Sequence, residues 1–326
     1  MDTKVVNKIR DKVLNLNEKK VLIANLENTL ESKDNYTKIN CNGFGRIRVF
    51  KNFSVHMSLN DKKTRKPLYR GHPIVDELRT QVFQLAGCNW RCWYCFVDYK
   101  LLSGNPKYGQ FFSTDELITL YSKDSSRPQV IDLSGGNPDI VPEWCLWTMQ
   151  SIEKYNLKEK VHIWLDDNLG TEIMWDVLTK EEIKYMASFP NHTRACCFKG
   201  YDQNSFEFNT GERKNSFDIQ FDVFRRLLKE GFNLYAYVTL TAPEGNCTKE
   251  KIRTFIDRLQ EIHPNLPLRT IPLEIKPYTA MVSRMNSTHE KSLDEQTKAY
   301  RYWWEELTKR YSTSELEKPY DEILLK

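Results

Sequence analysis

"QLAGCNWRCWYCFVDYK", residues Gln84–Lys100, places the cysteines Cys88, Cys92 and Cys95 within eight positions, directly after an apolar run. Cysteine thiolate is the usual ligand of iron–sulfur clusters and a common ligand of zinc. A closed site takes four ligands, so three thiols leave one metal position open to another group. Gaps of three and two residues let one tight loop reach three corners of a cubic cluster. The residues alone leave three readings: a three-cysteine cluster, a zinc site completed by a distant histidine, or a ferredoxin-type cluster completed by a remote cysteine.

Short apolar runs alternate with helical patterns around this stretch. The runs are rich in β-branched and aromatic residues, as expected for parallel strands that are buried on both faces. They span residues 81–86, 129–134, 161–166, 193–198, 233–241 and 269–276. Such alternation predicts an α/β fold whose βα units build a parallel sheet, either open or curled into a full or partial barrel. Ligands bind such sheets at the carboxyl ends of the strands, which is where the cysteine loop would lie.

Helix signals lie between the strand runs. Ser113 and Thr179 are each followed three positions later by glutamate, which predicts two capping boxes. Residues 217–232 and 248–262 carry apolar side chains at helical spacing. These segments supply the expected crossover helices.

The two ends of the chain fall outside this pattern. Residues 1–80 form an N-terminal extension, with a polar helix and then a hairpin around a turn at Asn60-Asp61. Residues 281–326 form a C-terminal helical extension whose aromatic stripe we expect to pack on the core. The stripe contains Tyr300, Trp303, Trp304 and Leu307. Residues 81–280 form the core domain.

Composition excludes some classes of protein. The 48 basic and 44 acidic residues leave a net charge of +4, which neither requires nor excludes a nucleic-acid partner. No apolar run is long enough to cross a bilayer, and the charged start of the chain lacks the apolar core of a signal peptide. We therefore expect a cytoplasmic protein without a membrane partner. The remaining cysteines are scattered, and we expect free thiols rather than disulfides or a second metal centre. They are Cys41, Cys145, Cys196, Cys197 and Cys247.

The motif CNWRCWYC resembles the C-x3-C-x2-C pattern of the radical S-adenosylmethionine (radical SAM) superfamily. The resemblance implies a partial (β/α)6 TIM-like barrel and a [4Fe–4S] cluster held by Cys88, Cys92 and Cys95. The fourth iron would be chelated by the amino and carboxylate groups of S-adenosylmethionine. Tyr94 would lie against the adenine, and we also count Phe96, on the other side of Cys95, among the cofactor contacts.

The segment DLSGGNPD follows the second strand run, and its glycines allow the backbone to approach a ligand closely. It resembles the GGE motif of the superfamily, which holds the methionine amino group. Gly135 and Gly136 match the motif. Asn137 stands where the glutamate usually stands, which removes one charge from that contact.

The segment HIWLDDNLG resembles the LDTNG segment of enzymes that activate glycyl-radical proteins, typified by pyruvate formate-lyase activating enzyme. The resemblance implies that Asp166, Asp167 and Asn168 lie beside the cofactor and a bound cation. From the residues alone, the two aspartates also suit an acid/base pair or a helix cap. Weaker similarity to the same enzymes extends over residues 80–280. Within it Lys199 follows the fourth strand, and Thr279 replaces an adenine-contacting histidine.

The activity implied by this resemblance is reductive cleavage of S-adenosylmethionine to methionine and a 5′-deoxyadenosyl radical, which abstracts hydrogen from a substrate. An electron donor of the flavodoxin or ferredoxin type is implied as a partner. The resemblance favours activation of a glycyl-radical enzyme. Modification of a peptide or protein side chain, or of a nucleotide or RNA, is the alternative, and a non-catalytic iron–sulfur or zinc protein is a more distant one.

Overall fold

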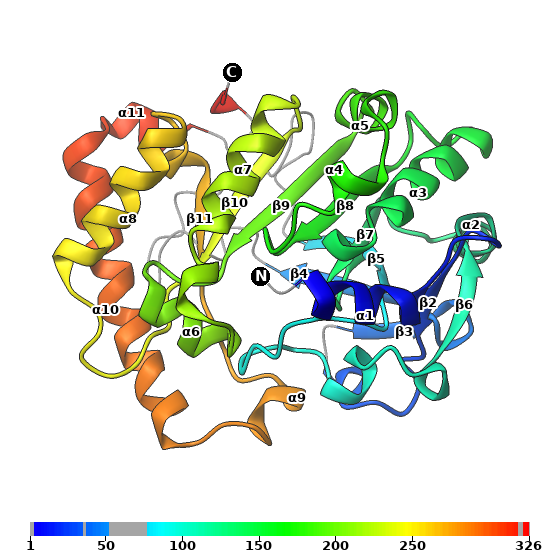
Figure 1. Ribbon diagram of the computed structural model, residues 1–326, viewed down its shortest axis with the longest axis horizontal. Coiled ribbons are helices and arrows are strands. Elements are labelled where there is room, and N and C mark those ends of the chain that lie inside the picture. The colour runs from blue at the N-terminus through cyan, green and yellow to red at the C-terminus, as the bar shows by residue number, and fades with distance from the viewer. Residues whose placement is uncertain (1–2, 35–36, 52–76, 319–321, 326) are drawn as a thin grey trace.

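A computed structural model describes residues 3–34, 37–51, 77–318 and 322–325, and an eight-stranded sheet is its central element (Figure 1). The strand order is β11-β10-β9-β8-β7-β5-β4-β3. The strands from β5 to β11 in this sheet run parallel, and β4 and β3 continue it in antiparallel pairing. The sheet strands are β3 (Thr37–Asn40), β4 (Gly45–Lys51), β5 (Glu77–Gln84), β7 (Val130–Ser134), β8 (His162–Asp167), β9 (His192–Phe198), β10 (Leu234–Thr239) and β11 (Thr270–Leu273).

The parallel strands correspond one by one to the predicted strand runs, with differences only at their ends. Helices separate them along the chain, so the predicted α/β fold with a partial parallel barrel is confirmed. The helices are α1 (Thr3–Val13), α2 (Thr114–Ser122), α3 (Pro142–Lys154), α4 (Met174–Val177), α5 (Lys180–Ala187), α6 (Gln203–Thr210), α7 (Ile219–Lys229), α8 (Lys249–Ile262), α9 (Thr279–Val282), α10 (Ser287–Arg310) and α11 (Thr313–Leu316).

Both predicted capping boxes begin helices. The Ser113 side chain accepts from the backbone of Glu116 at the start of α2, and the glutamate bonds back to the Ser113 backbone. Thr179 and Glu182 do the same at the start of α5. Each box satisfies backbone N–H groups that a helix start leaves without partners.

The N-terminal residues add to the core in two ways. A small antiparallel sheet joins β1 (Leu14–Asn15), β2 (Lys20–Ala24) and β6 (Gly109–Ser113), and Val21 and Leu22 are buried in the same apolar cluster as Phe83 of β5. Strand β4 pairs with β3 and β5. The predicted turn at Asn60-Asp61 lies outside the described residues.

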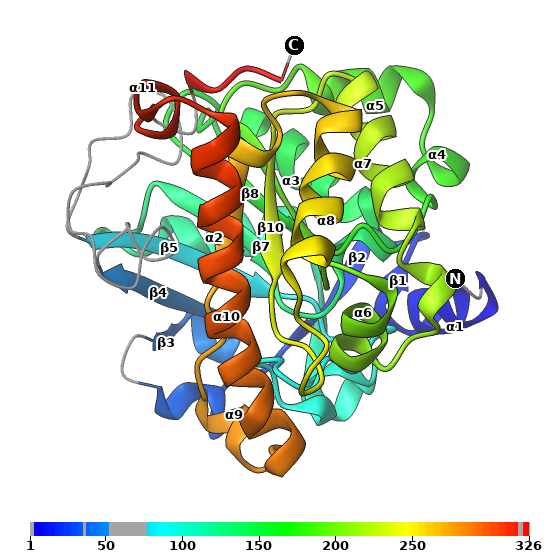
Figure 2. The ribbon, with the colours of Figure 1, turned by 90° about the vertical axis from the view of Figure 1, so that its left-hand side faces the viewer.

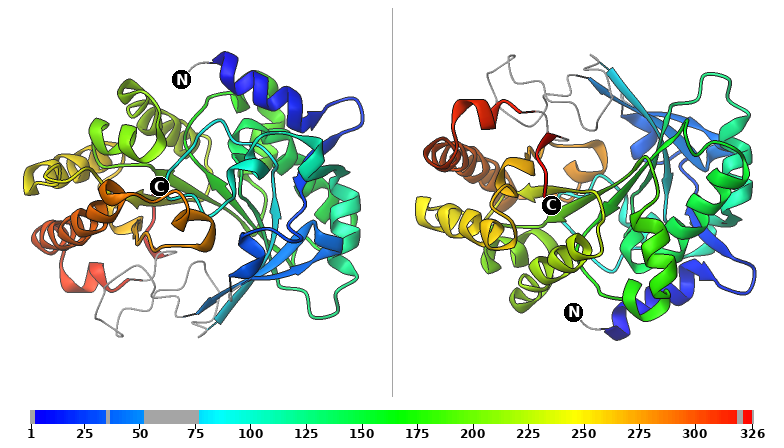
Figure 3. Two further views of the ribbon diagram at one scale, coloured as in Figure 1. Left: turned by 90° about the horizontal axis from the view of Figure 1, so that it is seen from below. Right: turned by 90° about the horizontal axis from the view of Figure 1, so that it is seen from above.

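The C-terminal helix α10 runs beside α8 (Figure 2). Trp303 is fully buried, Tyr300 and Leu307 are nearly so, and Trp304 packs partly buried against the core. The predicted packing of this stripe on the core is confirmed. Helices α1 and α10 lie on opposite sides of the molecule (Figure 3). Among the helices of the described ranges, none has the length and apolar character that crossing a bilayer requires.

Candidate functional site

The cysteine loop lies at the carboxyl end of β5. The Cys88 backbone N–H donates to the Leu102 carbonyl at 3.1 Å, and the Cys95 N–H donates to the Cys92 carbonyl at 3.0 Å. The Tyr99 hydroxyl bonds the carbonyls of Arg91 and Cys92, both at 2.9 Å. These contacts fold residues 88–102 back on themselves, so one closed loop carries all three cysteines.

Trp93 anchors this loop to two helices. Its indole N–H donates to Asn209 of α6 at 3.2 Å, and its ring stacks on His289 of α10 with centroids 4.4 Å apart. The Asn209 amide group in turn donates to the carbonyls of Lys199 and Thr241. The loop is therefore tied to the ends of β9 and β10 as well as to β5.

All three loop cysteines are free thiols. Burial raises the pKa of Cys88, and the neighbouring thiols of Cys92 and Cys95 raise it further. Burial also raises the pKa of Cys92 to about 12, where Lys199 opposes the shift. A metal that binds these sulfurs as thiolates must displace their protons.

Gly135 and Gly136 follow β7 with φ of 71° and 63°, a conformation that favours glycine. A Cβ on Gly136 would lie 2.3 Å from the Leu85 carbonyl oxygen and 2.5 Å from that of Gly87. The Asn137 N–H donates to the same Gly87 oxygen at 2.7 Å. The glycine turn therefore lies directly on the backbone that leads into the cysteine loop.

Three asparagines connect the loops after β5, β7 and β8. The Asn137 amide donates to Asn89 at 2.6 Å, and its oxygen accepts from Asn168 at 2.7 Å. Asn137 is fully buried. A glutamate at position 137 could accept from Asn168, but as a carboxylate it has no hydrogen to donate to Asn89. Asn137, which departs from the GGE pattern, can therefore donate to one neighbouring asparagine and accept from the other.

Asp166 faces the interior of the barrel at the carboxyl end of β8. Its carboxylate accepts from the Ser134 hydroxyl of β7 and from the Trp164 indole N–H at 3.1 Å. Asp132 lies two positions before Ser134 on the same face of β7. Burial and then the Asp166 carboxylate raise the pKa of Asp132 well above its usual value.

Asp167 points to the opposite, helix-covered face. It forms a buried ion pair with Arg194 of β9 at 2.7 Å and accepts from the Leu169 N–H at 2.7 Å. Asp139 lies nearby and accepts from the Gly170 N–H at 3.1 Å. The structure therefore separates the two aspartates of HIWLDDNLG: Asp166 lies with Ser134 beside the glycine turn, and Asp167 lies in the packing between sheet and helices.

The remaining candidates divide into two groups. Tyr94 is buried and its hydroxyl lies 3.1 Å from the Thr239 hydroxyl at the end of β10. Burial by itself would lower the pKa of Lys199, but the Cys197 thiol, the Tyr94 phenol and the Cys92 thiol raise it well above its usual value. Tyr94 and Lys199 therefore accompany the cysteine loop at the strand ends.

Phe96 and Thr279 instead contact the N-terminal residues. The guanidinium groups of Arg46 and Arg48 each lie 5.1 Å from the centre of the Phe96 ring. The Thr279 hydroxyl donates to Asp34 at 2.6 Å. The partners of both side chains therefore lie in the N-terminal extension and not at the carboxyl ends of the parallel strands.

The cysteine loop and the strands around it also match the model of a known protein family. The model described as the radical SAM superfamily matches residues 84–258, which is more than half of the chain and includes the cysteine loop and the strands β7 to β10. The chain belongs to the radical SAM superfamily. Enzymes of this superfamily use a [4Fe–4S] cluster and S-adenosylmethionine.

Solved structures resemble this radical SAM chain at low sequence identity. SuiB from Streptococcus suis, bound to the precursor peptide SuiA, has a TM-score of 0.47 and 15% identity, with 70% of this chain and 46% of that chain covered. The enzyme anSMEcpe with bound AdoMet has a TM-score of 0.43 and 14% identity, with 68% and 58% covered. A mutant of spore photoproduct lyase has a TM-score of 0.43 and 10% identity, with 76% and 77% covered.

These likenesses concern the fold alone. This chain spans about half the length of the SuiB chain that it matches. No curated protein sequence matches it.

The described residues fit the cofactors of the radical SAM family. Three soft thiols share one loop, and the turn at Gly135 and Gly136, which have positive φ, lies against the backbone that leads into it. Within the described ranges, no three His, Cys, Asp or Glu side chains are grouped around a single metal ion. A cubic cluster does not need such a group, because each cysteine binds a different iron.

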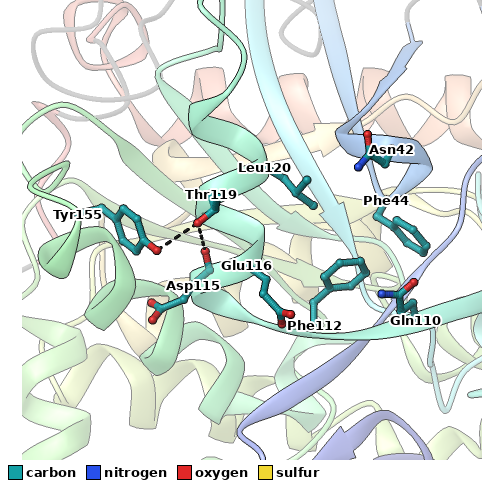
Figure 4. A pocket seen from close by; sticks show the side chains of 9 residues that line it. All are labelled: Asn42, Phe44, Gln110, Phe112, Asp115, Glu116, Thr119, Leu120 and Tyr155. Atoms are coloured by element: carbon teal, nitrogen blue, oxygen red, sulfur yellow. Dashed lines mark hydrogen bonds between the residues drawn. The ribbon is translucent and has the colours of Figure 1, made fainter.

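A surface pocket of about 450 Å³ lies apart from this site (Figure 4). It is formed by α2, β6 and neighbouring segments, and it contains no residue of the cysteine loop. Its acidic side chains already have partners, because Asp115 pairs with Lys154 and Glu116 belongs to the capping box of α2. Its lining residues are Asn42, Phe44, Gln110, Phe112, Asp115, Glu116, Thr119, Leu120 and Tyr155.

Sequence reasoning missed several residues of the site. Ser134 and Asn89 lie inside quoted motifs and could have been found as polar residues at strand ends. Trp164 is a strand residue whose partner depends on which face it occupies. Arg284 bonds the Cys95 carbonyl from the C-terminal extension. No sequence pattern marks Arg284.

Proposed function

We propose that this chain is a radical SAM enzyme that abstracts a hydrogen atom from a polypeptide, with activation of a glycyl-radical enzyme as the first candidate reaction. The single observation that carries the chemistry is the contact between the glycine turn after β7 and the backbone that leads into the three-cysteine loop. When bound, the cluster and S-adenosylmethionine supply a one-electron cleavage that gives methionine and a 5′-deoxyadenosyl radical. An electron donor of the flavodoxin or ferredoxin type provides that electron.

Each residue of the site has a proposed role. Cys88, Cys92 and Cys95 would hold the cluster, and they would leave one of its irons open to the cofactor. Gly135 and Gly136 let the turn after β7 pack closely against Gln84 and the Leu85 and Gly87 carbonyls, and this close packing would hold the turn beside the methionine end of the cofactor. Asp166 would orient the cofactor through its carboxylate, which Ser134 and Trp164 hold in place.

Tyr94 and Lys199 line the other side of the cysteine loop. Tyr94 is fixed by Thr239, so its ring is held in one orientation before the cofactor binds. Base stacking on an aromatic side chain contributes on the order of 1–3 kcal/mol. Lys199 keeps its positive charge beside Cys92, where it would attract the cofactor carboxylate. Asn137 and Asn168 would act by holding the three loops together.

Support for a polypeptide substrate comes from the residues of HIWLDDNLG, which resemble the activating enzymes, and from the balanced charge of the chain. A nucleic-acid substrate would favour a basic surface that contacts the phosphates along the strand. This chain has a net charge of +4 among 92 charged residues (48 basic and 44 acidic), so it has little excess positive charge for such a surface.

A second candidate is modification of a peptide or protein side chain. It is favoured by Thr279, which stands in place of the histidine of the activating enzymes and is bonded to Asp34. The sequence pattern of the glycyl-radical activating enzymes is therefore incomplete at position 279.

The test is an anaerobic assay of the reduced protein with S-adenosylmethionine. We expect slow formation of 5′-deoxyadenosine, lost when Cys88, Cys92 or Cys95 is changed to alanine and accelerated by the true substrate. A glycine-centred radical on a partner protein, seen by electron paramagnetic resonance, would identify the activase reaction. An altered peptide without a residual radical would identify the second candidate. Acceleration only by a nucleotide or RNA would contradict both.

A further inference from the structure

Arg284 lies between α9 and α10, outside the residues that match the family. Its guanidinium donates to the carbonyl of Cys95, the third cysteine of the loop. Its Nε donates to the Ala280 carbonyl at 3.0 Å, which fixes the side chain against its own segment. An arginine of the C-terminal extension therefore reaches the backbone of a cluster ligand 189 positions away.

The ring of Tyr99 supports this arginine from one side. The Arg284 guanidinium lies 4.2 Å from the Tyr99 ring centre, which is a close cation–π contact. The Tyr99 hydroxyl bonds the carbonyls of Arg91 and Cys92, so the ring is itself part of the cysteine loop. Arg284 is held by the same loop whose third cysteine it contacts.

One nitrogen of Arg284 is buried without a hydrogen-bond partner. Nη1 has no partner among the described residues, although the atom is inaccessible to solvent. A positive charge in such a place is poorly screened and acts on its surroundings more strongly than a charge in water.

Several other charged groups lie near the loop. Arg91, within the loop, donates to the Cys88 carbonyl at 2.7 Å, and Arg46 and Arg48 lie against the Phe96 ring. Glu31 accepts from the Asp98 N–H at 3.3 Å, and its negative charge is paired with Arg46 at 2.7 Å. Lys199 lies on the side of Cys92. Arg284 is therefore the cation on the Cys95 side of the loop that contacts the ligand's own backbone.

We propose that Arg284 is a positioning residue that raises the reduction potential of the cluster bound by Cys88, Cys92 and Cys95. The reduced cluster carries one more negative charge than the oxidised cluster, so a fixed cation beside one of its ligands stabilises the reduced form. Hydrogen bonds and charges around the sulfurs are known determinants of cluster potential. The effect is useful here because the cluster must accept an electron before it can pass that electron to the cofactor. This inference rests on the proposed function, since it requires the cluster.

The experiment measures the midpoint potential of the reconstituted full-length protein by redox titration, followed by electron paramagnetic resonance, without S-adenosylmethionine. Arg284→Gln and Arg284→Met both remove the charge, Arg284→Lys keeps it, and Arg225→Gln is the matched control. Arg225 is a half-exposed arginine of α7 that pairs with Asp222 and has no contact with the loop. Iron content is measured on every variant.

We expect the glutamine and methionine variants to keep their iron and to shift to a more negative potential. The lysine variant and the control should stay close to the parent. Parental potential in both neutral variants would overturn the proposal, and so would an equal shift in the lysine variant, because the charge would then not be the cause.

Loss of the cluster is also informative. If the neutral variants lose iron while the lysine variant retains it, the positive charge is needed to retain the cluster and not to set its potential, and the proposal fails. If the lysine variant loses iron as well, Arg284 is a structural anchor and the proposal fails. A parent protein that binds no cluster would instead contradict the proposed function.

Discussion

Asp166 and Asp167 are adjacent on β8, yet their carboxylates bind partners on opposite faces of the sheet. Asp166 bonds Ser134 and Trp164 inside the barrel, and Asp167 pairs with Arg194 beneath the helices. Successive strand residues point to opposite faces, so only one member of such a pair can reach a given site. The pair therefore divides between a proposed cofactor contact and a structural ion pair.

This division predicts different effects for two neighbouring substitutions. Asp166→Ala should weaken S-adenosylmethionine binding while the melting temperature changes little. Asp167→Ala should leave the Arg194 charge buried without its partner, which typically costs about 3–5 kcal/mol of stability. Calorimetric titration and thermal unfolding of both variants check this. Equal loss of binding with equal melting temperatures would show that the two aspartates share one role.

Substitutions of the cysteines should also have two different outcomes, depending on whether the cysteine lies in the loop. Alanine at Cys88, Cys92 or Cys95 should abolish the brown colour and the iron content, close to four irons per chain, of the anaerobically reconstituted protein. Alanine at the buried Cys145, or at Cys247, should leave both unchanged. Iron assay and visible absorption measure the result. A colourless parent that binds stoichiometric zinc would refute the cluster.

Gly136 can be tested against a glycine of the same conformation. Gly136 and Gly211 both have positive φ, at 63° and 72°, but a Cβ would collide with carbonyl oxygens only at Gly136. Both alanine variants carry the strain of the left-handed region, about 1–2 kcal/mol. Only Gly136→Ala should also displace the turn from the cysteine loop and lower affinity for S-adenosylmethionine. Similar affinities in the two variants, measured by equilibrium dialysis, would contradict the proposed position of the turn.

Asp139 predicts a pH dependence of stability. Burial, followed by the Asp167 carboxylate, raises the pKa of Asp139 to about 8, although Arg194 and Lys199 oppose the shift. An unfolded aspartate titrates near pH 3.9, so between about pH 4 and pH 8 the folded chain holds a proton that the unfolded chain has lost. The free energy of unfolding therefore decreases as pH rises through this window.

Asp139→Asn should remove that contribution. The variant should gain melting temperature over the parent more at about pH 9 than at about pH 5, because asparagine has no proton to lose. The Asn side-chain oxygen can still accept from Gly170. Thermal unfolding across the pH range measures this. Parallel curves for the two proteins would show that Asp139 does not titrate in this window.

Much of the fold was predictable because its signals are local. The apolar strand runs, the capping boxes at Ser113 and Thr179, and the aromatic stripe of α10 each depend on residues a few positions apart. The three cysteines share one loop for the same reason. A pattern within one turn or one strand is set by backbone geometry, so the sequence by itself specified these elements and the loop that carries the thiols.

The tertiary structure decided which polar residues accompany that loop. Nothing in HIWLDDNLG shows whether Asp166 or Asp167 faces the barrel, because a shift of one residue exchanges the two faces of a strand and only packing fixes the register. Asn89, Asn137 and Asn168 form one set only after three strand ends are brought together. Arg284 reaches Cys95 across 189 positions, a contact that depends on where α9 and α10 pack. Contacts of this kind have no local signal, because their partners become neighbours only when the sheet and its helices close around the core.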